Sequence, residues 1–183
     1  MKITNTDIQD VKIIEPQVFE DGRGWFMETY SRLKFAKLGI DIEFVQDNQS
    51  LSVPKGTLRG LHFQNNPKAQ TKLVRCIRGA ILDIAVDIRR GSPTYKKWAG
   101  IELSAENRKQ LFIPKGFAHG FVTLVDNCEV QYKVDEYYAP ECDRGIRFDD
   151  PEIGVDWGVT DPVLSAKDTK SPLLKDSDCN FYY

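Results

Sequence analysis

The two histidines of this chain have residue types and spacing suited to proton transfer. His62 lies in LRGLHFQ, three residues after Arg59, and His119 lies in PKGFAHGF. A lone histidine in a strand-like segment is more often structural than catalytic. An imidazole nevertheless has an unperturbed pKa of about 6.5, close to neutral pH. A fixed cation beside it raises the question of what polar ligand the segment meets.

Further polar groups lie in the neighbouring strand-like segments. Lys72 lies on the next predicted strand, and Tyr132 stands in the middle of EVQYKVD. Burying several polar side chains inside a small barrel is costly without a partner or ligand. The sequence therefore predicts a polar ligand at the mouth of a barrel, with acid–base chemistry by histidine and tyrosine.

Metal binding is the first alternative for the histidines. Barrels of this size often hold a metal through two or three histidines and a carboxylate. Position 64, which would complete an HxH pair, is Gln, so only a two-histidine site with Asp83 or Glu129 stays open. The chain has no GxSxG, P-loop or GxGxxG motif, and no cysteine lies near either histidine in sequence. We therefore expect neither a nucleophile elbow nor a bound metal.

The elements that must position these residues are short strands separated by turn residues. Their even spacing predicts an all-β sandwich or barrel. One helix is expected at 31–38, with Ser31 as its N-cap and Gly39 just past its end. Short helical turns are expected in the C-terminal segment. The expected strands are 11–15, 24–30, 43–50, 57–64, 71–79, 80–88, 98–104, 109–114, 119–125 and 128–138.

The segments 71–79 and 80–88 are adjacent and predict a hairpin that turns at an Arg-Gly pair. In the second of them the side chains alternate between two faces. One face is aliphatic and is expected in the core. The other carries Asp83 and Asp87, so we expect it to meet water or a polar cavity.

The composition is that of a soluble globular protein, with 41% hydrophobic and 28% charged residues among 183. No linker or repeat divides the chain, so one domain over 1–183 is expected. The net charge of −2 argues against nucleic acid or membrane as a partner. The start, MKITNTDIQDVKIIEPQ, lacks the apolar stretch of a signal peptide, and the four cysteines have no CxxC spacing. A cytoplasmic location with reduced thiols is expected.

Several long blocks of the chain, in order, resemble the dTDP-4-dehydrorhamnose 3,5-epimerase family. The resemblance runs from about residue 8 to about residue 175 and implies a cupin-like β-jelly-roll barrel. It also implies a homodimer, with strands exchanged or packed across the interface, and no metal or redox cofactor. The blocks are RGWFMETY, FVQDNQS, LRGLHFQ, KLVRCIRGAILDIAVDIRRGSPTY, LSAENRKQLFIPKGFAHGF, PEIGVDW and LSAKD.

The resemblance implies a cofactor-free reaction in dTDP-L-rhamnose biosynthesis. C3 and C5 of dTDP-4-dehydro-6-deoxy-D-glucose are inverted through enolates, giving dTDP-4-dehydro-L-rhamnose. By this resemblance His62 is the base and Asp168, in LSAKD, orients it. Tyr132 is the proton donor on the opposite face, and Lys72 stabilises the enolate oxygen. A neighbouring cation would also favour the phenolate of Tyr132.

The resemblance further implies a set of substrate-binding residues. Arg59 and Arg23 suit diphosphate oxygens, Arg23 from the partner subunit or else as a solvated turn residue. His119 either contacts the substrate or pairs with Asp83. The family usually has Glu where this chain has Asp143, a shorter side chain for which Glu141 is a nearby substitute. The remaining positions are Glu28, Gln46, Asp47 and Asn48 as nucleotide contacts, Tyr138 as a ring that stacks on thymine, and Lys167 as a basic contact.

Other functions remain open on the same scaffold. A mono-epimerase or a 3,4-ketoisomerase would use the same histidine–tyrosine pair. A non-catalytic cupin that binds sugar nucleotides is a different class, but it has no need of an acid facing a base. A metal-dependent cupin is the third alternative. The presence of His62, Lys72 and Tyr132 together favours the double epimerase.

Overall fold

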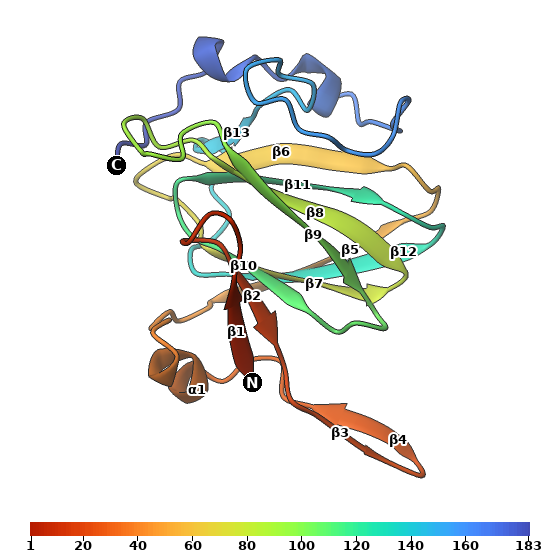
Figure 1. Cartoon of the computed structure of the whole chain (residues 1–183). Coiled ribbons are helices and arrows are strands. Elements are labelled where there is room, and N and C mark those ends of the chain that lie inside the picture. Colours follow the sequence, from red (N-terminus) through yellow and green to blue (C-terminus); the bar gives the residue numbers. More distant parts are fainter.

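The computed structural model describes residues 1–183 and consists mainly of antiparallel strands (Figure 1). One short helix, α1 (Arg32–Lys37), and two 3-10 helices, η1 (Asp168–Lys170) and η2 (Leu174–Asp176), complete it. The strands are β1 (Lys2–Asn5), β2 (Lys12–Glu15), β3 (Val18–Asp21), β4 (Gly24–Met27), β5 (Gln46–Ser52), β6 (Leu58–Gln64), β7 (Lys72–Arg78), β8 (Ala80–Asp87), β9 (Trp98–Ser104), β10 (Gln110–Ile113), β11 (Phe117–Thr123), β12 (Cys128–Val134) and β13 (Asp143–Gly145).

Two sheets face each other and enclose the core. One has the order β1-β2-β10-β7-β12-β5, and the other has the order β13-β6-β11-β8-β9. Side chains from both inner faces form a buried apolar cluster that includes Val74, Ile81, Leu111, Phe121 and Val130. The arrangement confirms the predicted all-β, cupin-like barrel with few helices. Strands β1, β3 and β13 were not predicted from the sequence.

The C-terminal segment lies over the outer face of the five-stranded sheet (Figure 1). It packs Trp157, Leu174 and Phe181 against Leu61 and Ile84 in a second buried cluster. The expected short helical turns are η1 and η2 in this segment. The apolar face of β8 is therefore buried against this cover, and Phe181 is part of the core.

The ends of α1 follow from local chemistry. The Ser31 side chain accepts a hydrogen bond from the backbone N–H of Lys34, which satisfies one of the free donors of the first turn. Gly39 has a φ of +85°, a conformation that glycine adopts without strain and that ends the helix. The predicted cap and stop are both confirmed.

The predicted hairpin of β7 and β8 is wrong, because the two strands lie in different sheets. β7 pairs with β10 and β12, whereas β8 pairs with β11 and β9. Gly79 makes the corner with a φ of +77°, and a Cβ there would lie 2.7 Å from the Sγ of Cys128. The Arg-Gly pair thus carries the chain from one sheet to the other, and this brings Lys72 and Asp83 onto facing strands.

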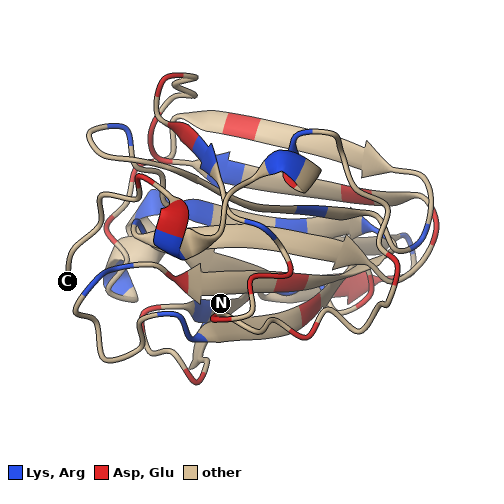
Figure 2. Cartoon of the chain, turned by 90° about the horizontal axis from the view of Figure 1, so that it is seen from above, with Lys and Arg blue, Asp and Glu red and all other residues tan.

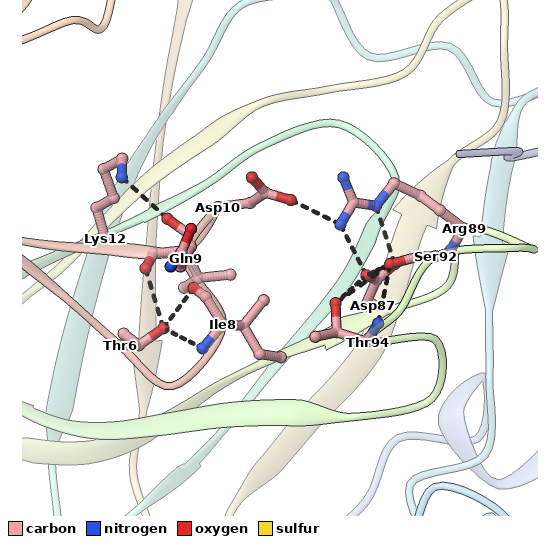
Figure 3. A network of polar contacts seen from close by, with 10 residues as sticks. Thr6, Ile8, Gln9, Asp10, Lys12, Asp87, Arg89, Ser92 and Thr94 are labelled. Carbon is pink, nitrogen blue, oxygen red and sulfur yellow. Dashed lines mark hydrogen bonds and ion pairs between the residues drawn. The ribbon is translucent and has the colours of Figure 1, made fainter.

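A polar network ties the end of β8 to the N-terminal loop (Figure 3). The buried carboxylate of Asp87 accepts hydrogen bonds from the backbone N–H and guanidinium of Arg89 and from the hydroxyls of Ser92 and Thr94, all between 2.6 and 3.0 Å. Arg89 also reaches Asp10, with a nitrogen–oxygen distance of 2.8 Å. Asp87 therefore meets neither water nor an open cavity, contrary to the sequence expectation.

The hairpin of β3 and β4 projects away from the two sheets (Figure 1). Its aromatic side chains Phe19, Trp25 and Phe26 are each more than half exposed.

Charged residues of both signs are interspersed along the ribbons (Figure 2). Any anionic ligand must therefore be bound by a few local cations rather than by a general basic field. No helix of the chain has the length and apolar character needed to span a membrane.

Candidate active site

A cavity of about 490 Å³ opens between the two sheets, and its lining is mostly polar. Strands β5, β7 and β12 contribute from one sheet and β6, β11 and β13 from the other, while η1 and the residues before it close one side. The structure brings ten of the predicted site residues to this cavity: Asn48, Arg59, His62, Lys72, His119, Tyr132, Tyr138, Asp143, Lys167 and Asp168.

His62 and Asp168 form a close pair in this cavity. Nε2 of His62 lies 2.5 Å from Oδ1 of Asp168, although 106 residues separate them in sequence. Gly60 has a φ of +130°, and a Cβ there would lie 2.5 Å from the Cα of Gly120. The glycine therefore permits the close approach of β6 and β11 that sets the position of His62. With Nε2 engaged, Nδ1 is the ring nitrogen left for a ligand.

Ser165 supports this pair from behind. Its hydroxyl donates to Oδ2 of Asp168 at 2.9 Å and accepts from the Asp168 backbone N–H at 3.1 Å. Burial alone would raise the pKa of Asp168, but the hydrogen bonds with His62 and Ser165 outweigh it and hold that pKa below its usual range. The carboxylate therefore stays ionised and oriented toward the imidazole.

A second histidine–aspartate pair lies beside the first. His119 is the direct cross-strand neighbour of His62, and its Nε2 lies 2.7 Å from Oδ1 of Asp83. Burial lowers the pKa of His119, although Asp83 opposes this, so the ring favours its neutral form. Oδ2 of Asp83 is buried without a hydrogen-bond partner in the protein. Of the two alternatives given for His119, the pairing with Asp83 is present.

Lys72 and Tyr132 face the histidines from the six-stranded sheet. Burial lowers the pKa of Lys72 to about 8. Its Nζ lies 5.9 Å from the centre of the Tyr132 ring. Burial also raises the pKa of the Tyr132 phenol, and the opposing charge of Arg59 does not overcome it. A neighbouring cation was expected to favour the phenolate of Tyr132. Burial has the larger effect on its pKa, so the phenol stays protonated at neutral pH.

The mouth of the cavity carries an acidic residue between two predicted ligand contacts. Oδ2 of Asp143 lies 2.5 Å from Nζ of Lys167 and accepts from the Tyr138 hydroxyl at 3.3 Å. Glu141 is exposed and does not line the cavity. Arg59 donates its Nε to Ser52 at 3.0 Å and one Nη2 bond to the Leu51 carbonyl at 3.2 Å. These bonds orient its guanidinium and leave further N–H groups for an anion.

Four predicted site residues lie outside the cavity in this single chain. Arg23 is on the projecting hairpin and pairs with Asp21 at 2.6 Å. Glu28 pairs with Lys34 at 2.9 Å, and Asp47 pairs with Lys133 at 2.9 Å. Gln46 holds Asn48 through its amide nitrogen and the backbone of Tyr138 through its oxygen. Their predicted contacts with a nucleotide therefore need either a second subunit or an indirect role.

Sequence reasoning missed several residues of the lining. Ser165 had a readable signal, because a serine three residues before an acidic residue is a common start of a helical turn. Gln64, Gln70 and Phe121 had none, since a single amide or ring in a strand or loop has no distinguishing sequence pattern. No three histidine, cysteine, aspartate or glutamate side chains gather as a metal site would require.

Comparison with known proteins places this geometry in a family. The family described as dTDP-4-dehydrorhamnose 3,5-epimerase matches residues 5–176. The protein of that name from Shigella flexneri is 50% identical over 179 residues, which cover 97% of this chain and 98% of that protein.

Two crystal structures of such enzymes are similar throughout. The one from Bacillus anthracis, with TDP and PPi bound, has a TM-score of 0.92 at 52% identity and covers 94% of this chain and 98% of its own. The one from Legionella pneumophila, in complex with dTDP-4-keto-L-rhamnose, has a TM-score of 0.94 at 44% identity and covers 100% and 98%. The similarity therefore extends over the whole fold rather than over the cavity alone.

Proposed function

The chain belongs to the dTDP-4-dehydrorhamnose 3,5-epimerase family, and from this premise we propose how its cavity performs the reaction. The protein is an isomerase that inverts C3 and C5 of dTDP-4-dehydro-6-deoxy-D-glucose. The C4 ketone acidifies the hydrogens on both carbons, so removal of either proton gives an enolate. Inversion then requires a base on one face of the sugar and an acid on the other.

His62 is the base in this proposal. Its Nδ1 is free while Nε2 is held 2.5 Å from the Asp168 carboxylate. That contact fixes the orientation of the ring and stabilises the imidazolium that forms when a proton is taken from carbon. Because Asp168 is kept ionised by His62 and Ser165, its carboxylate can stabilise the charge that the imidazole gains with the proton.

Tyr132 is the acid that returns the proton from the opposite face. The observation that carries this assignment is that His62 projects from β6 in one sheet and Tyr132 from β12 in the other, with the cavity between them. Burial raises the pKa of the phenol, so it is protonated when the enolate forms. We expect Tyr132→Phe to retain deuterium exchange with solvent but to lower inversion about 100-fold.

The matched control for this change is Tyr137→Phe, because the Tyr137 ring is exposed and lies outside the cavity. Both rates are measured on the same sample, exchange by NMR and inversion by trapping the product with a coupled reductase. Equal loss of exchange and inversion in Tyr132→Phe would contradict the role of donor.

The substrate is held by local cations and one ring. Lys72, which is protonated below about pH 8, lies beside Tyr132 where it can stabilise the enolate oxygen. The oriented guanidinium of Arg59 suits the diphosphate, and the exposed Tyr138 ring at the mouth suits stacking on the thymine. No metal or redox cofactor enters these steps.

A homodimer completes the site in this proposal. The projecting β3–β4 hairpin exposes Phe19, Trp25 and Phe26, an apolar surface that a second copy would cover. The hairpin also carries Arg23, whose exposed guanidinium could then reach the diphosphate in the partner's cavity. Light scattering is expected to give twice the chain mass, and Arg23→Ala is expected to raise KM more than it lowers kcat.

We also propose that the enzyme works in the cytoplasm. Its four cysteines, Cys76, Cys128, Cys142 and Cys179, are all buried free thiols. Free thiols are the usual state in a reducing compartment. Fractionation of the source cells should recover the activity with cytoplasmic markers.

The reaction itself is tested by solvent exchange. The protein is incubated with dTDP-4-dehydro-6-deoxy-D-glucose in D2O, and a coupled reductase traps the product. Deuterium at both C3 and C5 in a trapped L-rhamnose product is the expected result. Deuterium at one carbon alone would indicate a mono-epimerase, and nucleotide binding without exchange would indicate a non-catalytic protein.

A further inference from the structure

Three glutamine side chains from separate parts of the chain hold one short segment at the mouth of the cavity. The segment is residues 136–139, which contains Tyr138. Gln64 ends β6, Gln70 lies between β6 and β7, and Gln46 begins β5. Each forms hydrogen bonds with the backbone of this segment, so the backbone is fixed although the Tyr138 side chain is exposed.

Gln64 makes the most extensive of these contacts. It is only 3% exposed. Its Nε2 donates to the carbonyl of Tyr137 at 3.2 Å and to the carbonyl of Lys68 at 2.6 Å. Its Oε1 accepts from the backbone N–H of Ala139 at 2.9 Å. One buried amide thus holds the backbone on both sides of Tyr138.

Gln70 and Gln46 form hydrogen bonds with two further backbone groups of the segment. Nε2 of Gln70 donates to the carbonyl of Glu136 at 2.8 Å. Oε1 of Gln46 accepts from the backbone N–H of Tyr138 at 3.2 Å, while its Nε2 donates to Oδ1 of Asn48 at 2.9 Å. Gln46 therefore connects the segment to a residue that lines the cavity.

The fixed backbone matters because the Tyr138 ring itself is little supported. Tyr138 is 57% exposed, and its hydroxyl contacts only Asp143, at 3.3 Å. A mobile segment would have to be ordered each time a ligand binds, and that ordering weakens affinity. A ring carried on a segment already held by buried amides avoids most of this cost.

We propose that Gln64, assisted by Gln46 and Gln70, is a positioning residue that presets Tyr138 as the platform for the nucleobase. The inference rests on the proposed function, in which Tyr138 stacks on thymine. It assigns the glutamines to recognition of the nucleoside and not to proton transfer. Affinity for the nucleoside part of the substrate should therefore depend on Gln64, whereas affinity for the diphosphate part should not.

The test compares two probes, dTDP and inorganic pyrophosphate, by calorimetry on the full chain. Gln64→Met keeps the length of the side chain but removes the amide. Base–aromatic stacking accounts for about 5- to 150-fold in affinity, and we expect loss of the preset platform to raise the Kd for dTDP about 5- to 30-fold. The Kd for pyrophosphate should change less than about twofold, and KM should rise more than kcat falls.

Gln110→Met is the matched control. Gln110 is also buried, at 2% exposed, and its Nε2 also donates to a backbone carbonyl, that of Thr29 at 2.8 Å. Gln110 does not line the cavity. The control removes the same chemical group without touching the segment, so the Kd for dTDP should stay within about twofold of the parent value.

A double-mutant cycle with Tyr138→Ala separates this inference from the proposed function. If the platform acts through the ring, Gln64→Met should add less than about twofold to the dTDP Kd of Tyr138→Ala. Equal losses for dTDP and pyrophosphate, or full additivity with Tyr138→Ala, would overturn the positioning role. An unchanged dTDP Kd in Tyr138→Ala itself would instead reject the stacking role on which the inference rests.

Gln70→Met provides the same test if Gln64→Met does not fold. Gln70 is partly exposed and holds one carbonyl, so its loss is better tolerated. A smaller rise in Kd, about three- to tenfold, is expected for dTDP and none for pyrophosphate. A Kd for dTDP equal to that of the parent would contradict the proposal.

Discussion

The two histidine–aspartate pairs of the cavity have the same chemical groups but different surroundings. His62 and His119 are opposite each other on β6 and β11. The His62 side chain is 31% exposed and that of His119 is 8% exposed. Asp168 is supported by the hydroxyl of Ser165, whereas Oδ2 of Asp83 has no hydrogen-bond partner in the protein.

This difference indicates which pair can cycle a proton. A histidine that acts as a base must become charged, and burial opposes the charged form. The pKa of His119 is lowered by burial, so this ring favours its neutral form. His62 meets the cavity beside an ionised and supported carboxylate. Environment, rather than residue type, therefore favours His62 over His119 as the proposed base.

The largest expected effect comes from exchanging the two histidines separately for asparagine. His62→Asn removes the proposed base and should lower kcat about 1000-fold. His119→Asn keeps a hydrogen-bonding group near Asp83 and should lower kcat only about tenfold, with a comparable rise in KM. Steady-state kinetics with the coupled reductase measures both. A larger loss of kcat in His119→Asn than in His62→Asn would reverse the two roles.

The next effect concerns Lys72, which lies across the cavity from the pairs. Its pKa is lowered to about 8 by burial, so its charge is present below that pH and is lost as pH rises through it. In a plot of kcat against pH, we expect an alkaline limb on which kcat falls as the pH rises above about 8. At one pH unit above that value, kcat should be about tenfold lower. Lys72→Arg keeps the charge and should move this limb to higher pH.

Lys133→Arg is the control for the pH profile. Lys133 pairs with Asp47 and does not line the cavity, so its substitution should leave the limb in place. An alkaline limb that is the same in Lys72→Arg as in the parent enzyme would show that another group controls it.

A smaller effect should follow from weakening the support of Asp168. Ser165→Ala removes the 2.9 Å bond to Oδ2 and should lower kcat about tenfold, the value of one hydrogen bond to a charged group. Ser165→Thr restores the hydroxyl and should recover most of the rate. Failure of threonine to rescue, with the fold intact by circular dichroism, would indicate that Ser165 acts through packing alone.

The smallest effect on the rate is expected from Asp87, the other buried aspartate on the same face of β8. Its carboxylate is fully engaged by Arg89, Ser92 and Thr94 and lies outside the cavity. Asp87→Asn should lower the free energy of unfolding by about 3 kcal/mol. Urea unfolding measures this loss, and kcat of the folded enzyme should stay within about twofold. A large fall in kcat would mean that the hydrogen bonds of Asp87 also affect the geometry of the active site.

Local patterns in the sequence predicted much of the fold. The caps of α1 depend on Ser31 and Gly39 alone, and most strands follow from alternation and turn residues. The hairpin of β7 and β8 was wrong because two adjacent strands and a glycine turn look alike whether they pair or cross between sheets. Pairing depends on contacts distant in sequence, which alternation does not encode.

The site was less accessible to such reasoning. The pairing of His62 with Asp168 joins residues 106 positions apart, and only a resemblance to a family suggested it. Asp83 and Asp87 share a face of β8, yet one meets a histidine in the cavity and the other a structural arginine. The sequence pattern treats them equally, because their difference arises from the segments that fold over each end of the strand.

The most direct test of the account is deuterium exchange by the two asparagine variants in D2O. Each variant is incubated with saturating dTDP-4-dehydro-6-deoxy-D-glucose, and C3 and C5 are followed by NMR. We expect His62→Asn to give no deuterium at either carbon above the enzyme-free rate, whereas His119→Asn should label both. Labelling at either carbon by His62→Asn would contradict the assignment of His62 as the base.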